Sequence, residues 1–201
     1  MISVIVPTID GRESYLQGCL ASYAAHTDDY EVIVVPNKPS CGLAWTEGAG
    51  LAVGSHIHFS ADDLQPHAGW AVAALDVVER GFIPAPRILN TDGSLQSCGG
   101  DEAWEREQPT GSKAGFSRIP FLSRQQWDTI QLSVQGFLVD AHYYTDNAIS
   151  FAARRAGIEV GVHREFLFTH HLASVGRGAG TSWTQRMQED HYRYSKWVSS
   201  L

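Results

Sequence analysis

The segment Ile57-His58-Phe59-Ser60-Ala61-Asp62-Asp63 is a short apolar run that ends in two adjacent carboxylates. Two other apolar runs precede it in the chain, at residues 2–6 and 31–35, and a proline follows each of them. Between these runs, apolar residues recur about every 3.6 positions, which is the spacing of one buried helical face. This alternation of strand and helix patterns is typical of a parallel sheet covered by helices, so the sequence predicts an α/β fold.

The rest of the chain continues this pattern less regularly. Residues 90–118 are rich in Gly, Ser, Asp, Glu and Gln, and Thr91-Asp92-Gly93-Ser94 is typical of a tight turn. The other expected elements are, in order, a helix carrying Trp70, Ala74, Val77 and Val78 that stops at Gly81, an extended segment 82–89, a helix from Asp146 to Gly157, an extended run 165–169, and a final helix with Trp183, Met187, Tyr194 and Val198 on one face. We therefore expect more loops in the second half of the chain than in the first.

The composition describes a chain that can bury one substantial core. It has 201 residues, of which 43% are hydrophobic and 18% charged, and its net charge is −7. This negative balance disfavours a nucleic-acid-binding protein. No run approaches the roughly 20 apolar residues of a membrane-spanning helix, and no basic segment or cleavage site follows Met1, so we expect a cytoplasmic protein without a membrane span. The cysteines, at 19, 41 and 98, form no CxxC pair and are expected to be reduced thiols.

Polar side chains follow each of the first three apolar runs. In an open parallel sheet, ligands bind at the carboxyl ends of the strands, so these side chains would face one crevice. Each residue taken alone is also a common turn former or helix cap. Adjacent aspartates at the end of a buried strand are costly unless they are neutralised, and a divalent cation shared with a diphosphate would neutralise them. The residues concerned are Thr8, Asp10 and Arg12, then Asn37 and Lys38, then Asp62 and Asp63.

The order of several short motifs resembles that of a family-two glycosyltransferase with the GT-A fold, in particular a compact bacterial or phage-type member. The resemblance covers about residues 2–171. The motifs are Ser3-Val4-Ile5-Val6-Pro7-Thr8, Glu31-Val32-Ile33-Val34-Val35-Pro36-Asn37, Gly50-Leu51-Ala52, Phe59-Ser60-Ala61-Asp62-Asp63 with Pro66 and Gly69-Trp70, Pro86-Arg87-Ile88-Leu89, Asp92-Gly93-Ser94-Leu95-Gln96, Tyr144-Thr145-Asp146, Arg154-Arg155-Ala156-Gly157-Ile158 and Thr169-His170.

This resemblance implies a Rossmann-like, mostly parallel sheet flanked by helices, the nucleotide-diphospho-sugar transferase architecture. It implies a single GT-A domain over residues 1–201. Within it, residues 1–89 would bind the nucleotide sugar, residues 90–171 would form the acceptor and catalytic half, and residues 172–201 would form a C-terminal tail helix.

The resemblance also implies a donor site. Thr8 and Asp10 fall where the family contacts the base and ribose of a nucleotide sugar, and Arg12 falls close enough to reach a phosphate. The residue before Asn37 is usually acidic in the family, but here it is Pro36. Asn37, Asp10 or a backbone group would therefore have to make the usual base contact. Asp62 would face the ribose or support its neighbour.

A metal site and a catalytic base follow from the same resemblance. The family's Asp-x-Asp motif falls on Ala61-Asp62-Asp63, so the first carboxylate is missing. Asp63 matches the carboxylate that binds the metal, and His170 matches a late histidine that completes the shell of a Mn²⁺ or Mg²⁺ ion, with His171 as the alternative. Asp146 matches the catalytic base, although its position before an Ala-rich helix also suits a helix N-cap.

The implied function is inverting transfer of a sugar from a nucleoside diphosphate, with UDP favoured, to the hydroxyl of a glycan, a protein or another acceptor. Nucleic acid is a less favoured acceptor because of the charge. This function requires that Asp63 and Asp146 face one cleft. Residues 93–118, with Trp104, lie where the family builds acceptor loops, while Trp183 and Trp197 could stack on sugars or simply pack.

Two other functions fit parts of the sequence. A non-catalytic module on the same fold, binding a sugar nucleotide or a partner protein, would explain Pro36 and the missing carboxylate at Ala61. A sugar-nucleotide pyrophosphorylase would need a glycine-rich basic loop after the first strand to hold a nucleoside triphosphate. The segment Ile9-Asp10-Gly11-Arg12 is too short and too poor in glycine for that role.

Overall fold

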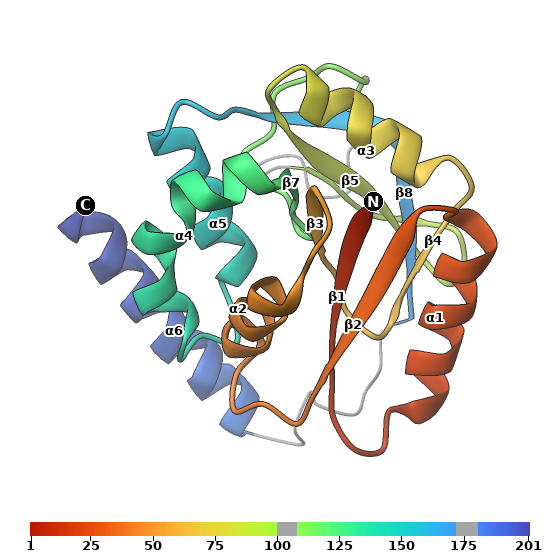
Figure 1. The fold of residues 1–201 in the computed structure, drawn as a ribbon. Coiled ribbons are helices and arrows are strands. Elements are labelled where there is room, and N and C mark those ends of the chain that lie inside the picture. The colour runs from red at the N-terminus through yellow and green to blue at the C-terminus, as the bar shows by residue number, and fades with distance from the viewer. Residues whose placement is uncertain (100–107, 172–180) are drawn as a thin grey trace.

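Figure 1 shows the chain as two β-sheets flanked by helices. The structure is a computed structural model that describes residues 1–99, 108–171 and 181–201, apart from the side chains of 181–184. In these residues no helix is both long enough and apolar enough to span a membrane. The elements are β1 (Ile2–Thr8), α1 (Glu13–His26), β2 (Tyr30–Pro36), α2 (Cys41–Leu51), β3 (His56–Phe59), β4 (Leu64–Pro66), α3 (Trp70–Glu79), β5 (Ile83–Asn90), β6 (Leu95–Cys98), β7 (Phe121–Ser123), α4 (Arg124–Leu138), α5 (Thr145–Arg155), β8 (Val160–His170) and α6 (Thr181–Ser200).

The two sheets differ in strand direction. The first has the order β2-β1-β3-β7, in which β2, β1 and β3 are parallel and β7 is antiparallel to β3. The second has the order β4-β8-β5-β6, in which β5 and β8 are parallel and the outer pairings are antiparallel. The expected parallel arrangement therefore describes the three N-terminal strands, whereas the second sheet is mixed. Its antiparallel pairing of β4 with β8 brings His170 opposite Leu64, immediately after the two aspartates.

Strand β1 separates two hydrophobic cores, which explains its uninterrupted apolar sequence. Val4 and Val6 face a core built with α1 and α3, whereas Ile5 faces a core built with α2, α4 and α5. All three side chains are fully buried. A strand covered on both faces has no polar alternation, as seen in β1. The sequence predicts that Pro7 ends this strand, but the strand continues to Thr8. Pro7 lies opposite Val35, where it removes only one hydrogen-bond donor near the end of the strand.

Helix α4 was not anticipated from the sequence, although a local signal for it exists. Ser123 is its N-cap and accepts from the Gln126 amide, while the Gln126 side chain accepts from the Ser123 amide, so the two form a capping box. Its apolar residues then follow at helical spacing and are buried, namely Trp127, Ile130, Val134, Phe137 and Leu138. The strand before it, β7, has three residues and is too short to give a strand pattern in the sequence.

The C-terminal helix α6 packs on α4 through aromatic side chains. The Trp197 ring lies 5.5 Å from that of Phe137 and 5.7 Å from that of Phe151, and its indole N–H donates to the Ser133 carbonyl at 3.2 Å. These contacts favour packing over sugar stacking as the role of Trp197. Trp183 lies outside the described side chains. None of the three cysteines forms a disulfide, as expected.

His58 is a fully buried histidine inside an aromatic cluster. Its ring lies 5.1 Å from that of Trp70 and 5.5 Å from that of Phe168, and it also faces Tyr23, Phe121 and Phe166. Neither ring nitrogen has a hydrogen-bond partner among the described residues. The pKa of His58 is lowered to about 3, because burial outweighs the nearby Pro120 carbonyl, which raises the pKa. That carbonyl already accepts a hydrogen bond from the Phe59 amide. The folded protein therefore keeps this ring neutral in its core.

Replacing His58 with Leu, a side chain of similar volume, should make the free energy of unfolding depend less on pH below about pH 6.5. The unfolded chain protonates this histidine below about pH 6.5, while the folded chain resists protonation down to about pH 3. Between these two pH values the unfolded state binds more protons than the folded state. The contribution of His58 to the free energy of unfolding is therefore complete above about pH 6.5 and falls by about 1.4 kcal/mol for each pH unit below it. Urea unfolding at pH 7 and pH 5 measures this loss, and the exposed His26→Leu is the control. An equal loss in wild-type protein and His58→Leu would contradict the assignment.

Candidate functional site

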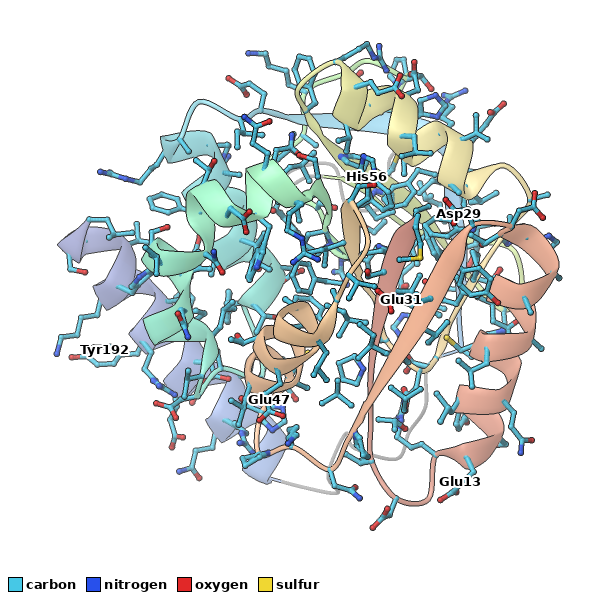
Figure 2. All side chains as sticks on the ribbon, in the orientation of Figure 1. Glu13, Asp29, Glu31, Glu47, His56 and Tyr192 are labelled. Carbon is cyan, nitrogen blue, oxygen red and sulfur yellow. The ribbon has the colours of Figure 1, made fainter. Side chains whose placement is uncertain are left out.

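The candidate site lies at the carboxyl ends of β1, β2 and β3. In Figure 2, Glu13 and Glu47 lie toward this edge of the first sheet, while His56 and Asp29 lie toward the opposite edge. The turn that follows β3 is held from several elements. The Trp45 indole donates to the Ser60 carbonyl at 3.0 Å, the Tyr23 hydroxyl lies 2.8 Å from the Ser60 hydroxyl, and the Cys19 thiol donates to the Ala61 carbonyl at 3.5 Å. These contacts fix the backbone that carries Asp62 and Asp63.

Arg12 forms the centre of the site by binding both aspartates. Its Nε donates to Asp62 Oδ2 at 2.8 Å, and its Nη2 donates to Asp62 Oδ1 at 2.5 Å and to Asp63 Oδ2 at 2.8 Å. The hydrogen bond to Asp62, more than any other contact, holds the pKa of the guanidinium above its ordinary value. Tyr15 packs beneath it, with its ring centroid 5.3 Å from the Arg12 carbon Cζ. The resemblance puts Arg12 close enough to reach a phosphate, and in the structure its guanidinium binds the two carboxylates.

Asp62 is an anchoring residue in this network. It is 3% exposed, and in addition to Arg12 it accepts a hydrogen bond from the Thr8 hydroxyl at 2.7 Å. A buried carboxylate is costly unless charged or polar donors surround it, and Arg12 and Thr8 supply such donors. Of its two expected roles, support of Asp63 through Arg12 is the one that this geometry favours.

Asp63 faces His170, which β8 brings alongside. His170 Nε2 lies 3.4 Å from Asp63 Oδ1, and its Nδ1 lies 2.9 Å from the side-chain oxygen of Gln96. The Gln96 oxygen accepts from Nδ1, while Nε2 faces the carboxylate: a protonated Nε2 donates to Asp63, and a deprotonated Nε2 offers a lone pair to a cation placed between the two residues. Burial would raise the pKa of Asp63, but His170 and then Arg12 outweigh it and hold the pKa below its ordinary value.

A pair made of a carboxylate oxygen and an imidazole lone pair is suited to holding a divalent cation. The hydrogen bond from Nδ1 to Gln96 is the kind of contact that fixes the tautomer of a metal-ligating histidine. In the described part of the chain, however, no group of three or more His, Cys, Asp and Glu side chains converges. The two residues thus fit a cation whose remaining ligands come from phosphate oxygens or water. His171, the alternative ligand, donates its backbone amide to the Asp63 carbonyl at 2.7 Å.

Asp10 and Asn37 form a second, more exposed pair beside this network. The Asn37 amide donates to Asp10 Oδ1 at 2.9 Å, and the Asp10 backbone amide donates to Asn37 Oδ1 at 3.0 Å. Asn37 adopts the left-handed conformation, with φ of 52°, and its own amide donates to the Thr8 carbonyl at 2.8 Å. The pair therefore joins the loop after β1 to the loop after β2. The Lys38 ammonium nearby lies 2.5 Å from Glu47 Oε2.

Asp146 lies in the first turn of α5 and is not its N-cap. The N-cap is Tyr144, which has a left-handed φ of 64° and makes no side-chain cap. Burial, and then the negative charges of Asp146, Asp62 and Asp63, together raise the pKa of the Cys41 thiol to about 12, against a hydrogen bond from Thr145 that lowers it. All three carboxylates therefore act on one thiol at the start of α2. Asp146 and Asp63 thus both lie within electrostatic reach of the Cys41 thiol.

Arg118 lies near Asp146 and is not among the site residues predicted from the sequence. Burial lowers the pKa of its guanidinium, and the charge of Asp146 opposes this effect, so the two residues lie within electrostatic reach of each other. It belongs to the polar segment that was read only as a loop. Arg118 could have been identified from the sequence, because it is a basic residue at the end of that segment, just before the apolar residues 119–122.

Residues 40–42, at the start of α2, are joined to the segment 138–141 by contacts with its main chain. The Gly42 amide donates to the Ala141 carbonyl at 2.9 Å, and the Ser40 hydroxyl donates to the Val139 carbonyl at 2.8 Å. A Cβ atom at Gly42 would lie 2.1 Å from the Leu138 carbonyl oxygen, so only glycine permits this approach. The start of α2 thereby fixes the segment that leads to Asp146.

Comparison with solved structures shows that the chain has a glycosyltransferase fold of the GT-A type. The structure of GalNAc-T7 with UDP, GalNAc and Mn²⁺ superimposes with a TM-score of 0.66 at 13% sequence identity. The match covers 85% of this chain and 43% of that one, so this chain spans less than half of its structural neighbour. No family model matches the sequence, and no curated protein matches it. At this identity the likeness defines the fold and leaves the activity to be argued from the site.

The close approach at Gly42 makes a prediction with a matched control on the same helix. Gly42→Ala should destabilise the protein by about 1–3 kcal/mol, because the new methyl group must displace the Leu138 backbone. Gly50→Ala, where no atom lies within 4 Å of the added Cβ, should instead stabilise α2 by about 0.5–1 kcal/mol. Urea unfolding measures both. Equal stabilisation by the two substitutions would show that the two segments are not in contact.

Proposed function

We propose that this protein is an inverting glycosyltransferase, which moves a sugar from a nucleoside-diphosphate donor to an acceptor hydroxyl with Asp146 as the general base. The observation that carries the proposal is the convergence of Asp63, His170 and the Arg12 cation at the strand ends, and it is supported by the position of Asp146 within electrostatic reach of the Cys41 thiol, as Asp62 and Asp63 also are. The GT-A fold supports it, because ligands bind at this edge of such sheets. Membership of family two, and of its compact bacterial or phage-type branch, belongs to this proposal and rests on the sequence motifs.

The donor is a UDP-sugar in this proposal, held with the help of Mn²⁺ or Mg²⁺. The GalNAc-T7 structure contains UDP and Mn²⁺, which supports both choices. Asp63 Oδ1 and His170 Nε2 would hold the cation, and the cation would stabilise negative charge on the departing diphosphate. Arg12 keeps Asp63 oriented through its hydrogen bond to the other carboxylate oxygen. Thr8 and Asp62 in turn keep Arg12 in place.

The Asp10 and Asn37 pair is suited to contacting a nucleobase or ribose. It presents a carboxylate and an amide at the exposed margin of the site, and so offers both acceptors and donors. Pro36 stands where the family usually has an acid, and the carboxylate of Asp10, tied to Asn37, supplies an acid close to that position. The base contact would therefore come from the loop after β1 instead of from the end of β2.

Asp146 performs the proton transfer in this mechanism. The acceptor oxygen forms a bond to the anomeric carbon while the bond from that carbon to the diphosphate oxygen breaks, and the hydroxyl proton passes to the Asp146 carboxylate. With base and leaving group on opposite faces of the sugar, the configuration at the anomeric carbon inverts. The acceptor is the hydroxyl of a glycan, a protein or another molecule. Trp104 and its neighbours, expected to contact it, lie outside the described residues.

A non-catalytic sugar-nucleotide-binding or partner-binding module is the second candidate. One observation favours it: the Arg12 guanidinium pairs with both Asp62 and Asp63 and offsets one of their two negative charges, which lessens their need for a metal ion. Tight nucleotide-sugar binding without turnover distinguishes this module from the transferase.

Incubation with a panel of nucleotide sugars and Mn²⁺ tests the proposed reaction. We expect release of nucleoside diphosphate from at least one donor, most readily a UDP-sugar. Asp146→Asn should lower turnover by about 10²-fold or more with donor affinity nearly unchanged, because the base is needed only as the bond forms. Asp128→Asn, an exposed position on α4, is the control. A silent panel with tight binding would favour the module, and full turnover by Asp146→Asn would remove that residue from the role of base.

Calorimetry tests the role of Asp63 in holding a metal ion. Donor binding by the wild-type protein should be tighter with Mn²⁺ than with EDTA, and Asp63→Ala should abolish this difference, because it removes one of the two protein ligands. Asp29→Ala, at the opposite edge of the sheet, should retain the difference (Figure 2). Identical donor affinity with and without Mn²⁺ in the wild-type protein would refute the metal assignment.

A further inference from the structure

Asp190 is a buried acid on α6 that accepts hydrogen bonds from the backbone of the turn 142–144. It is 3% exposed, whereas Tyr192 on the same helix is 69% exposed and points outward in Figure 2. Its Oδ2 accepts two backbone hydrogen bonds, from the amides of His142 and Tyr143, each at 3.0 Å. An apolar residue would pack at such a position with less desolvation cost, so the carboxylate is explained by these two amides.

The two amides immediately precede the residues that orient Asp146. Tyr144 follows them in the left-handed conformation, which costs roughly 1–2 kcal/mol for a non-glycine residue. Two side chains of α6 pack against the Tyr144 ring. Tyr194 stacks on this ring with centroids 5.4 Å apart and planes at 18°, and the His191 ring lies 5.3 Å from it. Two positions after Tyr144, Asp146 lies in the first turn of α5. The conformation of this turn sets where α5 begins, and hence the direction of the Asp146 side chain.

Helix α6 also reaches the loop on the donor side. The Arg186 guanidinium donates to the Pro39 carbonyl at 3.1 Å, two residues after Asn37. Closer to Asp190, Arg193 donates to Asp140 Oδ2 at 2.8 Å and lies 3.6 Å from Asp190 Oδ1. The helix therefore contacts both loops that border the candidate site. Figure 1 shows it running along α4 and α5 on the outside of the molecule.

We propose that Asp190 is a positioning residue for the transfer reaction, which fixes the turn 142–144 so that Asp146 points at the acceptor hydroxyl. This inference rests on the proposed function and deepens it. Asp190 lies on the outer side of the turn and does not contact substrate. Its removal should therefore slow transfer without weakening donor binding, because donor contacts come from the strand ends.

Three variants of α6 test this role. Asp190→Ala removes both hydrogen bonds, Asp190→Asn keeps an oxygen that can accept them, and Glu189→Gln removes the neighbouring exposed charge as the control. The first readout is hydrogen exchange of the amides of residues 141–147. We expect exchange there to be at least about tenfold faster in Asp190→Ala, close to wild type in Asp190→Asn, and unchanged in Glu189→Gln.

The second readout separates positioning from loss of folded protein. With any donor that the wild-type protein uses, Asp190→Ala should lower kcat for transfer by about 10-fold to 10²-fold, with the donor Kd within about twofold of wild type. Asp190→Asn should recover most of the rate. A purely structural role would lower transfer and the binding-competent fraction together. If Asp190→Ala does not fold, Asp190→Ser is measured in its place.

The outcomes distinguish this inference from the proposed function. Unchanged exchange at 141–147, or unchanged transfer by a folded Asp190→Ala, overturns the role of Asp190 while the transferase remains. Absence of turnover by the wild-type protein overturns the proposed function, and with it the catalytic meaning of Asp190. Faster exchange together with slower transfer and intact donor binding supports the inference.

Discussion

The arrangement of the site depends on one buried ion cluster, the guanidinium of Arg12 between Asp62 and Asp63. Three segments meet there: the loop after β1, the turn after β3 and, through His170, the end of β8. Two adjacent carboxylates in a buried turn repel each other, and a planar cation with parallel donors satisfies both in a fixed geometry. Removing one member of such a cluster leaves uncompensated buried charge, at a cost of roughly 3–5 kcal/mol. The same interaction therefore stabilises the fold and orients the carboxylate directed at His170.

Much of the fold could be predicted because its signals are local. The apolar runs of β1, β2 and β3, the helical spacing in α1 and α3, and the turn at residues 91–94 each lie within a few residues of sequence. Helix α4 was not predicted, although its capping box is equally local. The mixed second sheet could not be predicted in this way, since the pairing of β4 with β8 joins residues about a hundred positions apart. That pairing brings His170 to Asp63.

The candidate site shows the same division. The sequence predicts that polar residues lie at the strand ends, but it does not predict which side chains they bind. Arg12 was expected to face a phosphate, and its pairing with Asp62 across fifty positions is a tertiary contact that no spacing reveals. Asp146 could be read as a helix cap until the structure placed the cap at Tyr144. Asp190 gave no signal in the sequence, because an acid on a polar helix is ordinarily solvated, and only its packing against a turn distinguishes it.

The join between Gly42 and the 138–141 segment uses main-chain atoms, apart from the Ser40 hydroxyl. A backbone amide and carbonyl are common to nearly every residue type, so the geometry of this join is insensitive to most substitutions around it. Side chains around this join can then diverge over evolution while the spacing between the start of α2 and the segment 138–141 is inherited. Glycine at 42 is the exception, and we expect it to be the slowest position in this region to change.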